Sequence, residues 1–131
     1  DELEIRSASA DYLEQYKEVD IALDTYPYPG GGTTCEALYM GVPVISLYGS
    51  RHGSRFGYSL LQNIGIGELA AATLEGYVER AVALARDPQL LRALQKQLRP
   101  MMQASCLMNQ KVYMQSIERL YEEIWQGWCQ K

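Results

Sequence analysis

Residues 20–47 read DIALDTYPYPGGGTTCEALYMGVPVISL, and this stretch decides the fold that the sequence predicts. The apolar residues near its two ends, Ile21–Leu23 and Val42–Leu47, predict two buried strands. Between them we expect a turn-rich loop over Tyr26–Gly32 and a short helix that opens at Thr33. A strand, a loop, a helix and a second strand make a βαβ unit, which predicts a parallel α/β sheet.

The loop combines prolines with a run of glycines. Pro27 and Pro29 fix the backbone φ angle, whereas Gly30–Gly32 permit conformations and close approaches that a Cβ atom would prevent. Such a loop can wrap a phosphate group. Ligands of open α/β sheets bind outside the carboxyl ends of the strands, which is where this loop begins.

The residues after the glycines allow two interpretations. Thr33, Thr34 and Glu36 place hydroxyl groups, a carboxylate and free backbone N–H groups at the start of a helix, which suits a bound anion. The same Thr33 and Glu36 also form the pattern of a capping box, in which the two side chains satisfy the helix start themselves. The spacing matches neither G-x-G-x-x-G nor a Walker loop with its lysine, so both interpretations stay open.

Two stretches resemble a known family. DTYPYPGGGTTCEALYMGVP (24–43) and GSRHGSRFGYSLLQNIGIGELAA (49–71) resemble the O-GlcNAc transferase and SPINDLY family, especially its bacterial SPINDLY-like members with tetratricopeptide repeats upstream. The resemblance implies a GT-B glycosyltransferase that moves a sugar from a nucleotide sugar to Ser or Thr of proteins, with inversion and without a required metal. This chain would be a partial Rossmann-like fragment of the C-terminal, donor-binding half.

The resemblance also implies roles for individual residues. Gly31, Gly32 and Thr33 fall where the family contacts the donor diphosphate, and Thr34 lies beside them. Glu36 falls where an acidic residue binds the ribose. The vertebrate-type enzymes carry a histidine in this glycine stretch, and this chain lacks it, so backbone amides would have to replace it. The donor-binding residues expected here are Gly30, Gly31, Gly32, Thr33, Thr34 and Glu36.

A second polar cluster follows the second predicted strand, over Tyr48–Arg55. We expect Ser54 to cap a helix that runs to about Asn63, which would place His52 and Arg55 near a helix start at the same edge of the sheet. A solvated loop is the alternative. Because relatives often keep a basic residue or a histidine here, the resemblance favours His52 and Arg55 as donor-binding residues, and no catalytic base is identifiable in the chain.

Length, composition and charge limit the other possibilities. With 131 residues, 47% of them hydrophobic, the chain can form at most one domain. Its net charge of −4 argues against a nucleic-acid partner, and it has no apolar run of roughly 18 residues that could span a membrane. Cys35, Cys106 and Cys129 are too few and too widely spaced for a disulfide framework, which favours a cytoplasmic location. We expect Cys35 to pack in the core.

Further strands are expected at Leu3–Arg6 and Leu69–Ala71. A helix over Asp11–Lys17 is expected between the first of these strands and the βαβ unit. The predicted fold is therefore α/β over residues 1–72, with a parallel sheet of about three to four strands flanked by helices. Because the first residue is Asp and a GT-B half normally has about six strands, we expect residues 1–131 to be a single fragment of a longer protein. The resemblance implies that the preceding strands and a donor-binding lysine are missing.

Residues 73–131 are predicted to be helical. Thr73 should cap a helix that runs to about Arg86, and Asp87-Pro88 should open the next one, which Pro100 bends or ends. The last helix, over about Asn109–Gln130, carries an apolar stripe that we interpret as core. A C-terminal helix of GT-B proteins crosses back to the N-terminal half, so the resemblance implies three alternatives: this helix lies partly exposed, swaps or seals a dimer. The stripe consists of Val112, Tyr113, Ile117, Leu120, Tyr121, Ile124, Trp125 and Trp128.

Three functions remain compatible with the sequence. The leading one is the donor-binding half of an inverting protein O-glycosyltransferase that uses UDP-GlcNAc or GDP-fucose, with upstream repeats selecting the protein acceptor. The fragment would be inactive alone and, because of an unpaired sheet edge, prone to self-association. The alternatives are a non-catalytic Rossmann-like interaction module and a GT-B transferase that acts on a non-protein acceptor.

Overall fold

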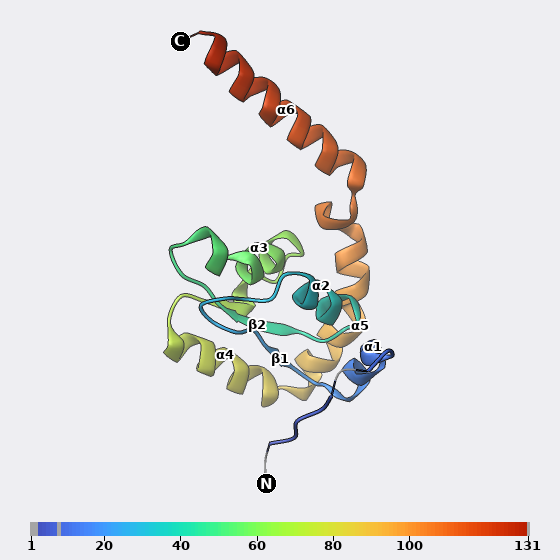
Figure 1. The fold of residues 1–131 in the computed structure, drawn as a ribbon. Coiled ribbons are helices and arrows are strands. Elements are labelled where there is room, and N and C mark those ends of the chain that lie inside the picture. Colours follow the sequence, from blue (N-terminus) through green and yellow to red (C-terminus); the bar gives the residue numbers. More distant parts are fainter. Residues whose placement is uncertain (1–2, 8, 131) are drawn as a thin grey trace.

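The computed structural model describes residues 3–7 and 9–130. Figure 1 shows an α/β body around a small sheet, with a long C-terminal helix that projects from it. Within the described residues, strands β1 (Ala22–Leu23), β2 (Val44–Leu47) and β3 (Ala70–Ala71) form a parallel sheet in the order β1-β2-β3. The predicted parallel α/β fold and its three strands are confirmed.

The central strand β2 organises the core. It pairs with β1 through Ala22 and Val44, and with β3 through Ser46 and Ala70. Val44, Ile45 and Ser46 are all almost completely buried, although successive side chains point to opposite faces. Both faces of β2 are therefore covered, which explains its continuous apolar sequence.

Helices cover the sheet on both sides. Helix α2 (Gly32–Tyr39) connects β1 to β2, and α3 (Phe56–Asn63) leads from β2 towards β3. Figure 1 shows α2 and α3 on one side of the sheet and α4 (Leu74–Ala85) on the other. Leu38 of α2 and Leu61 of α3 are fully buried and anchor the core.

Both connecting helices end in the same way. Gly41 and Gly65 have φ angles of 87° and 82°, a region that residues with a Cβ rarely adopt. After each glycine a backbone N–H reaches back to the helix: Val42 donates to the carbonyl of Ala37 at 2.8 Å, and Ile66 donates to that of Leu61 at 3.0 Å. This is the Schellman arrangement, and it turns the chain back towards the sheet.

The predicted caps of the next two helices are confirmed. The hydroxyl oxygen of Thr73 accepts a hydrogen bond from the Gly76 amide at the start of α4. The carboxylate of Asp87 accepts two amide hydrogen bonds at the start of α5 (Pro88–Ala104). Pro100 lies inside α5, which continues to Ala104, so the expectation that the helix might end at Pro100 is wrong.

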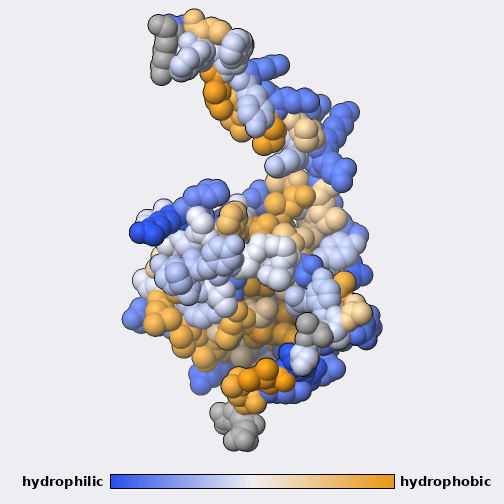
Figure 2. Space-filling model, in the orientation of Figure 1, coloured by the Kyte–Doolittle hydropathy of each residue, from blue (hydrophilic) through white to orange (hydrophobic). Residues whose placement is uncertain are grey.

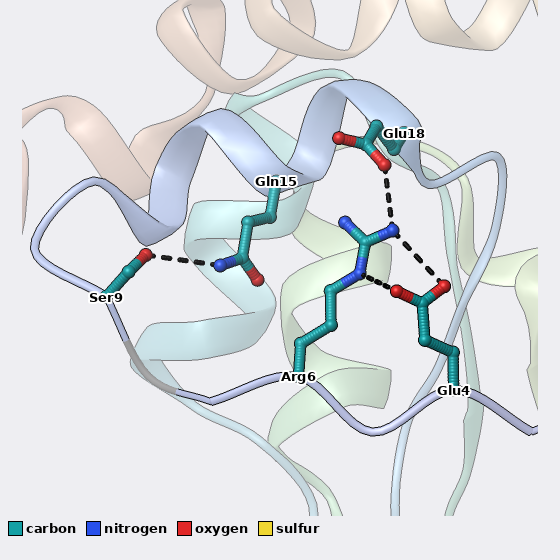
Figure 3. Close-up of polar contacts among 5 residues, drawn as sticks. All are labelled: Glu4, Arg6, Ser9, Gln15 and Glu18. Carbon is teal, nitrogen blue, oxygen red and sulfur yellow. Dashed lines mark hydrogen bonds and ion pairs between the residues drawn. The ribbon is translucent and has the colours of Figure 1, made fainter.

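The predicted strand at Leu3–Arg6 does not form: residues 3–7 are irregular. Leu3 and Ile5 are 80% and 88% exposed, and no strand in the described part of the chain pairs with them. Instead, Arg6 pairs with Glu4 and with Glu18, as Figure 3 shows. Ion pairs at such an exposed site contribute little to stability.

The helix expected at Asp11–Lys17 forms in two parts. An α-helical turn, α1 (Tyr12–Gln15), continues into a 3₁₀ turn, η1 (Tyr16–Glu18). Glu18, which pairs with Arg6, belongs to this 3₁₀ turn. Figure 3 also shows the amide of Gln15 donating to the hydroxyl of Ser9, so the N-terminal segment lies against α1.

The last helix, α6 (Gln110–Cys129), is not part of the core. Asn109 caps it by accepting the Val112 amide, yet no residue of the helix is buried. Trp125 and Trp128 are 66% and 70% exposed, so the interpretation of the stripe as core is wrong and the alternative of exposure holds. Figure 2 shows hydrophobic residues along the projecting helix.

No helix in the described part of the chain is long and apolar enough to cross a membrane.

Candidate functional site

The glycine-containing loop begins where β1 ends. The Asp24 carboxylate accepts a hydrogen bond from the Gly30 amide at 2.7 Å, which closes the loop onto the end of the strand. Within the loop, the hydroxyl of Thr25 donates to the carbonyl of Tyr28 at 2.6 Å. The loop is thus held by its own side chains at the carboxyl edge of the sheet.

The start of α2 is open for an anion. The first helical hydrogen bond runs from the Cys35 amide to the carbonyl of Gly31, at 3.1 Å. The amides of Gly32, Thr33 and Thr34 have no acceptor among the described residues. Three free amides at the positive end of a helix are a suitable site for a phosphate group.

The predicted capping box is wrong. Gly31 occupies the N-cap position of α2, and no side chain caps this helix. Thr33 lies inside the first turn, two residues after the N-cap position, and the Glu36 carboxylate accepts a hydrogen bond from Tyr12 of α1 instead. The physical reason is that α2 starts at Gly32, so the Thr33 side chain lies past the N-cap position from which a hydroxyl accepts a first-turn amide.

The two threonine hydroxyls lie against the glycine loop. A Cβ atom added at Gly30 would lie 2.5 Å from both the Thr33 and the Thr34 hydroxyl oxygens, so a larger residue would have to displace these side chains. At Gly31 and Gly32, by contrast, an added Cβ would meet nothing within 4 Å. An open pocket of about 210 Å³ lies where the glycine loop, β1 and the start of α2 meet. It is lined by Tyr16, Ala22, Leu23, Asp24, Thr25, Gly30, Thr33, Thr34, Ala37 and Val44.

Glu36 lies one helical turn further along α2 and is bonded to α1. The hydroxyl of Tyr12 donates to its Oε1 atom at 2.9 Å, and this bond raises the pKa of Tyr12 above its usual value. The hydroxyl of Tyr16 reaches the carbonyl of Thr33 at 3.5 Å. Partial burial, with a smaller contribution from the Glu36 charge, raises the pKa of Tyr16.

An apolar groove lies on the other side of Glu36, between α1, α2 and the end of α5. Its volume is about 410 Å³, and it is lined by Leu13, Cys35, Glu36, Tyr39, Met40, Met102, Leu107 and Met108. Cys35 is partly buried against the core, and this burial raises the pKa of its thiol. The structure agrees with the interpretation of Cys35 as a packing residue.

The second polar cluster is arranged differently from the prediction. Ser54 does not cap α3: Arg55 occupies the N-cap position, and the Ser54 hydroxyl donates to the carbonyl of Arg51 at 2.9 Å. The reason is a 3₁₀ turn, η2 (His52–Ser54), which directs Ser54 inwards, where it is buried.

His52 and Arg55 are both held by aromatic rings. The guanidinium of Arg55 lies 5.3 Å and 4.9 Å from the ring centres of Tyr48 and Tyr58, and it donates to the carbonyl of Gly49. The His52 ring contacts the edge of Phe56, with 5.3 Å between the ring centres. The contacts of both side chains are therefore with their own segment, and their roles in donor binding stay predictions.

The two polar loops meet at the edge of the sheet. A Cβ atom added at Gly49 would lie 2.9 Å from the Ser54 hydroxyl and 3.0 Å from the Tyr26 hydroxyl, which shows how closely the loops approach. Between them is a pocket of about 500 Å³, lined by Tyr26, Pro27, Tyr28, Ser50, Arg51, Gly53 and Ser54. Arg51, rather than His52 or Arg55, provides the basic side chain of this pocket.

This chain is similar to known proteins over most of its length. Residues 7–117 match glycosyl transferase family 41. The chain belongs to this family. A probable UDP-N-acetylglucosamine--peptide N-acetylglucosaminyltransferase SPINDLY from Hordeum vulgare is 41% identical over 119 residues, which are 91% of this chain and 13% of the relative. The protein of the same name from Arabidopsis thaliana is 40% identical, with the same coverage.

A solved structure supports the family 41 fold. The mutant O-GlcNAc transferase from Thermobaculum terrenum superimposes with a TM-score of 0.85 at 37% identity, covering 95% of this chain and 24% of that chain. This chain spans about 13% of the length of the plant relatives from Hordeum vulgare and Arabidopsis thaliana. The resemblance to the O-GlcNAc transferase and SPINDLY family that the sequence indicated is confirmed.

Sequence reasoning missed three residues of the candidate site. Asp24, Tyr12 and Tyr16 contact the loop or the first turns of α2. Asp24 could have been found, because it directly follows the first strand at the edge where ligands bind. The two tyrosines carried no local sequence pattern, since their partners lie 24 and 17 residues further along the chain.

Proposed function

We propose that this chain is the donor-binding segment of an inverting protein O-glycosyltransferase, which moves a sugar from a nucleotide sugar to Ser or Thr of proteins. The observation that carries the proposal is the open start of α2. There the unpaired amides of Gly32, Thr33 and Thr34 lie beside two threonine hydroxyls, with the Glu36 carboxylate one turn away.

Each group of the nucleotide would have a matching partner. The diphosphate would accept hydrogen bonds from the amides at the start of α2 and from the Thr33 hydroxyl. The ribose diol would donate to the Glu36 carboxylate, which has acceptor capacity beyond its bond with Tyr12. As the sugar leaves, negative charge grows on the diphosphate, and fixed donors stabilise that charge without rearrangement.

The donor is either UDP-GlcNAc or GDP-fucose. The names of the relatives from Hordeum vulgare and Arabidopsis thaliana specify UDP-N-acetylglucosamine, which favours UDP-GlcNAc. GDP-fucose is the alternative that the bacterial SPINDLY-like resemblance suggested.

We expect no required metal. In the described residues, no group of three or more His, Cys, Asp or Glu side chains is arranged to hold one.

The rest of the reaction requires more protein than this chain. Strand β1 has a partner on one side only among the described residues, and Leu23 is 58% exposed. We propose that residues 1–131 are one fragment of a cytoplasmic catalytic domain whose remaining strands pair with this edge. Repeats upstream would select the acceptor protein, and the apolar face of α6 would pack against the missing half.

The test is calorimetric titration of the complete protein that carries this chain with UDP and GDP. We expect one of them to bind, and Glu36→Ala to weaken binding by about 10- to 100-fold, since hydrogen bonds to a charged group contribute about 1.5–3 kcal/mol. Thr33→Val should weaken it by a smaller factor. Glu79→Ala, an exposed glutamate on α4, is the matched control and should leave the affinity unchanged.

A non-catalytic interaction module is the second candidate, favoured by one observation. The exposed apolar residues on α6 form a surface that could bind a partner protein. If the folded complete protein bound neither UDP nor GDP, this second function would replace the first. A transferase with a non-protein acceptor would bind nucleotide in the same way and would be recognised by the acceptor that it labels.

A further inference from the structure

Asp24 connects three segments that are far apart in the sequence. Its Oδ1 atom accepts the Gly30 amide at 2.7 Å, and its Oδ2 atom accepts the Ser46 hydroxyl of β2 at 2.8 Å. Both distances are short, as expected when the acceptor is a carboxylate. The backbone carbonyl of Asp24 also accepts the hydroxyl of Tyr77, from α4, at 3.0 Å. Each oxygen of the side chain thus has a protein donor.

The surroundings leave the carboxylate little freedom. A Cβ atom added at Gly57, in the first turn of α3, would lie 2.4 Å from Oδ2 of Asp24 and 2.2 Å from the Ser46 hydroxyl. The backbone of α3 therefore closes the side of the site that faces away from the loop. Ser46 is 1% exposed and Asp24 is half-buried, so the Asp24–Ser46 hydrogen bond is partly shielded from water.

The Gly30 bond sets the position of the anion site. Gly30 lies two residues before the start of α2, and a Cβ atom added to it would lie 2.5 Å from the hydroxyl oxygens of Thr33 and Thr34. A shift of the Gly30 amide would move the glycine run and the first-turn amides together. The hydrogen bond from Gly30 to Asp24 therefore links the sheet to the loop that leads into the first-turn amides, in addition to the packing of Ala37 and Leu38 in the core.

We propose that Asp24 is a positioning residue of the diphosphate site. Its carboxylate anchors the glycine loop to β1 and β2 and thereby aims the amides at the start of α2 at the diphosphate. This inference rests on the proposed function and extends it, because it assigns the placement of the anion site to a residue that need not contact the ligand. Asp24 acts through Gly30, and Ser46 holds Asp24 in place.

The test compares three variants of the complete protein that carries this chain. Asp24→Ala removes both acceptors, Asp24→Asn keeps a neutral acceptor of the same size, and Ser46→Ala removes one donor but leaves the Gly30 bond. The first readout is hydrogen exchange of the peptide that contains Gly30, measured without nucleotide. The second is the dissociation constant for UDP compared with that for uridine, or for GDP compared with guanosine if GDP is the ligand.

We expect Asp24→Ala to speed exchange of the loop and to weaken diphosphate binding by roughly tenfold or more, while nucleoside binding changes by less than about twofold. Asp24→Asn should recover roughly half of this loss in binding free energy, because a neutral hydrogen bond is roughly half as strong as a charge-assisted one. Ser46→Ala should have the smallest effect. A general loss of folding would instead lower both affinities together.

Equal losses of diphosphate and nucleoside affinity in Asp24→Ala, or unchanged exchange of the loop, would overturn the proposal. If Asp24→Ala does not fold, the other two variants test the proposal. The proposal then requires that Asp24→Asn weakens diphosphate binding more than Ser46→Ala does. A wild-type protein that binds no nucleotide would contradict the proposed function. The exchange readout would then decide by itself whether Asp24 holds the loop.

Discussion

The hydroxyl of Tyr12 donates a hydrogen bond to Oε1 of Glu36 at 2.9 Å, across 24 residues of sequence. The Glu36 carboxylate is thus bonded to α1 and not to the start of its own helix, which has no side-chain cap among the described residues. Tyr12 also limits the rotation of the carboxylate. The proposed ribose-binding group is therefore oriented by a helix that precedes β1.

This hydrogen bond predicts a pKa that depends on Glu36. The bond and the negative charge both stabilise the protonated phenol, so the pKa of Tyr12 is raised. In Glu36→Gln the charge is absent, and we expect the pKa of Tyr12 to fall towards its usual value. NMR titration of the tyrosine rings measures this. Glu79→Gln is the control and should leave the pKa of Tyr12 unchanged. If the pKa of Tyr12 were the same in the wild-type protein and in Glu36→Gln, the hydrogen bond would be refuted.

Core packing predicts a large difference between two leucines. Leu38 is fully buried against the sheet, whereas Leu74 is 63% exposed at the start of α4. We expect Leu38→Ala to lower the free energy of unfolding by about 2–5 kcal/mol, because it leaves a cavity. Leu74→Ala should change it by about 0.5 kcal/mol or less. Urea denaturation measures both, and similar losses in the two variants would contradict the assigned core.

Two glycines should respond to alanine in opposite directions. Gly41 has a φ of 87°, and an added Cβ would lie 2.8 Å from the carbonyl oxygen of Gln95. Gly41→Ala should therefore destabilise the protein by more than about 1 kcal/mol. At Gly127, in α6, an added Cβ meets nothing, and alanine favours the helix by about 0.5–1 kcal/mol. Thermal unfolding distinguishes them, and a stabilised Gly41→Ala protein would show that α2 ends differently.

The cysteines should differ in reactivity. Burial, with a smaller contribution from the Glu36 charge, raises the pKa of Cys35, so its thiol stays protonated at neutral pH. Cys106 and Cys129 are exposed. We expect iodoacetamide to label these two first at pH 7.5, and Cys35 to react faster as the pH rises towards its raised pKa. In denatured protein the three rates should converge, and fast labelling of Cys35 in the native protein would contradict its burial.

The isolated chain should associate. Its β1 edge and the apolar face of α6 both lack a partner in the described structure. Light scattering after size exclusion should show a mass that rises with protein concentration. Replacing Ile124 and Trp128 with glutamate should reduce this association if α6 causes it. A monomer at high concentration would remove the reason to expect that these surfaces are buried in a larger protein.

Local patterns predicted local structure well. Thr73 and Asp87 cap their helices as expected, because each cap needs only an amide two or three residues away. The same reasoning failed for Ser54, where a 3₁₀ turn moved the hydroxyl inwards. It also failed for residues 3–6, because a strand needs a neighbour that the sequence of the strand itself does not specify.

The apolar stripe of α6 shows a different limit. Its spacing correctly predicted an amphipathic helix, and Asn109 caps it. The spacing did not indicate that the described chain has nothing to cover the stripe. A periodic pattern reveals which face of a helix is apolar, but burial of that face depends on what lies opposite.

The sequence by itself determined the βαβ unit, the glycine loop, the helix that follows it and membership of glycosyl transferase family 41. These depend on backbone freedom, on apolar runs and on residues close together in the chain. Only the tertiary structure decided that Asp24 holds Gly30 and Ser46, and that Tyr12 holds Glu36. The Asp24–Ser46 contact depends on the register of β1 against β2, and the Tyr12–Glu36 contact on how α1 packs against α2. No short stretch of sequence encodes either.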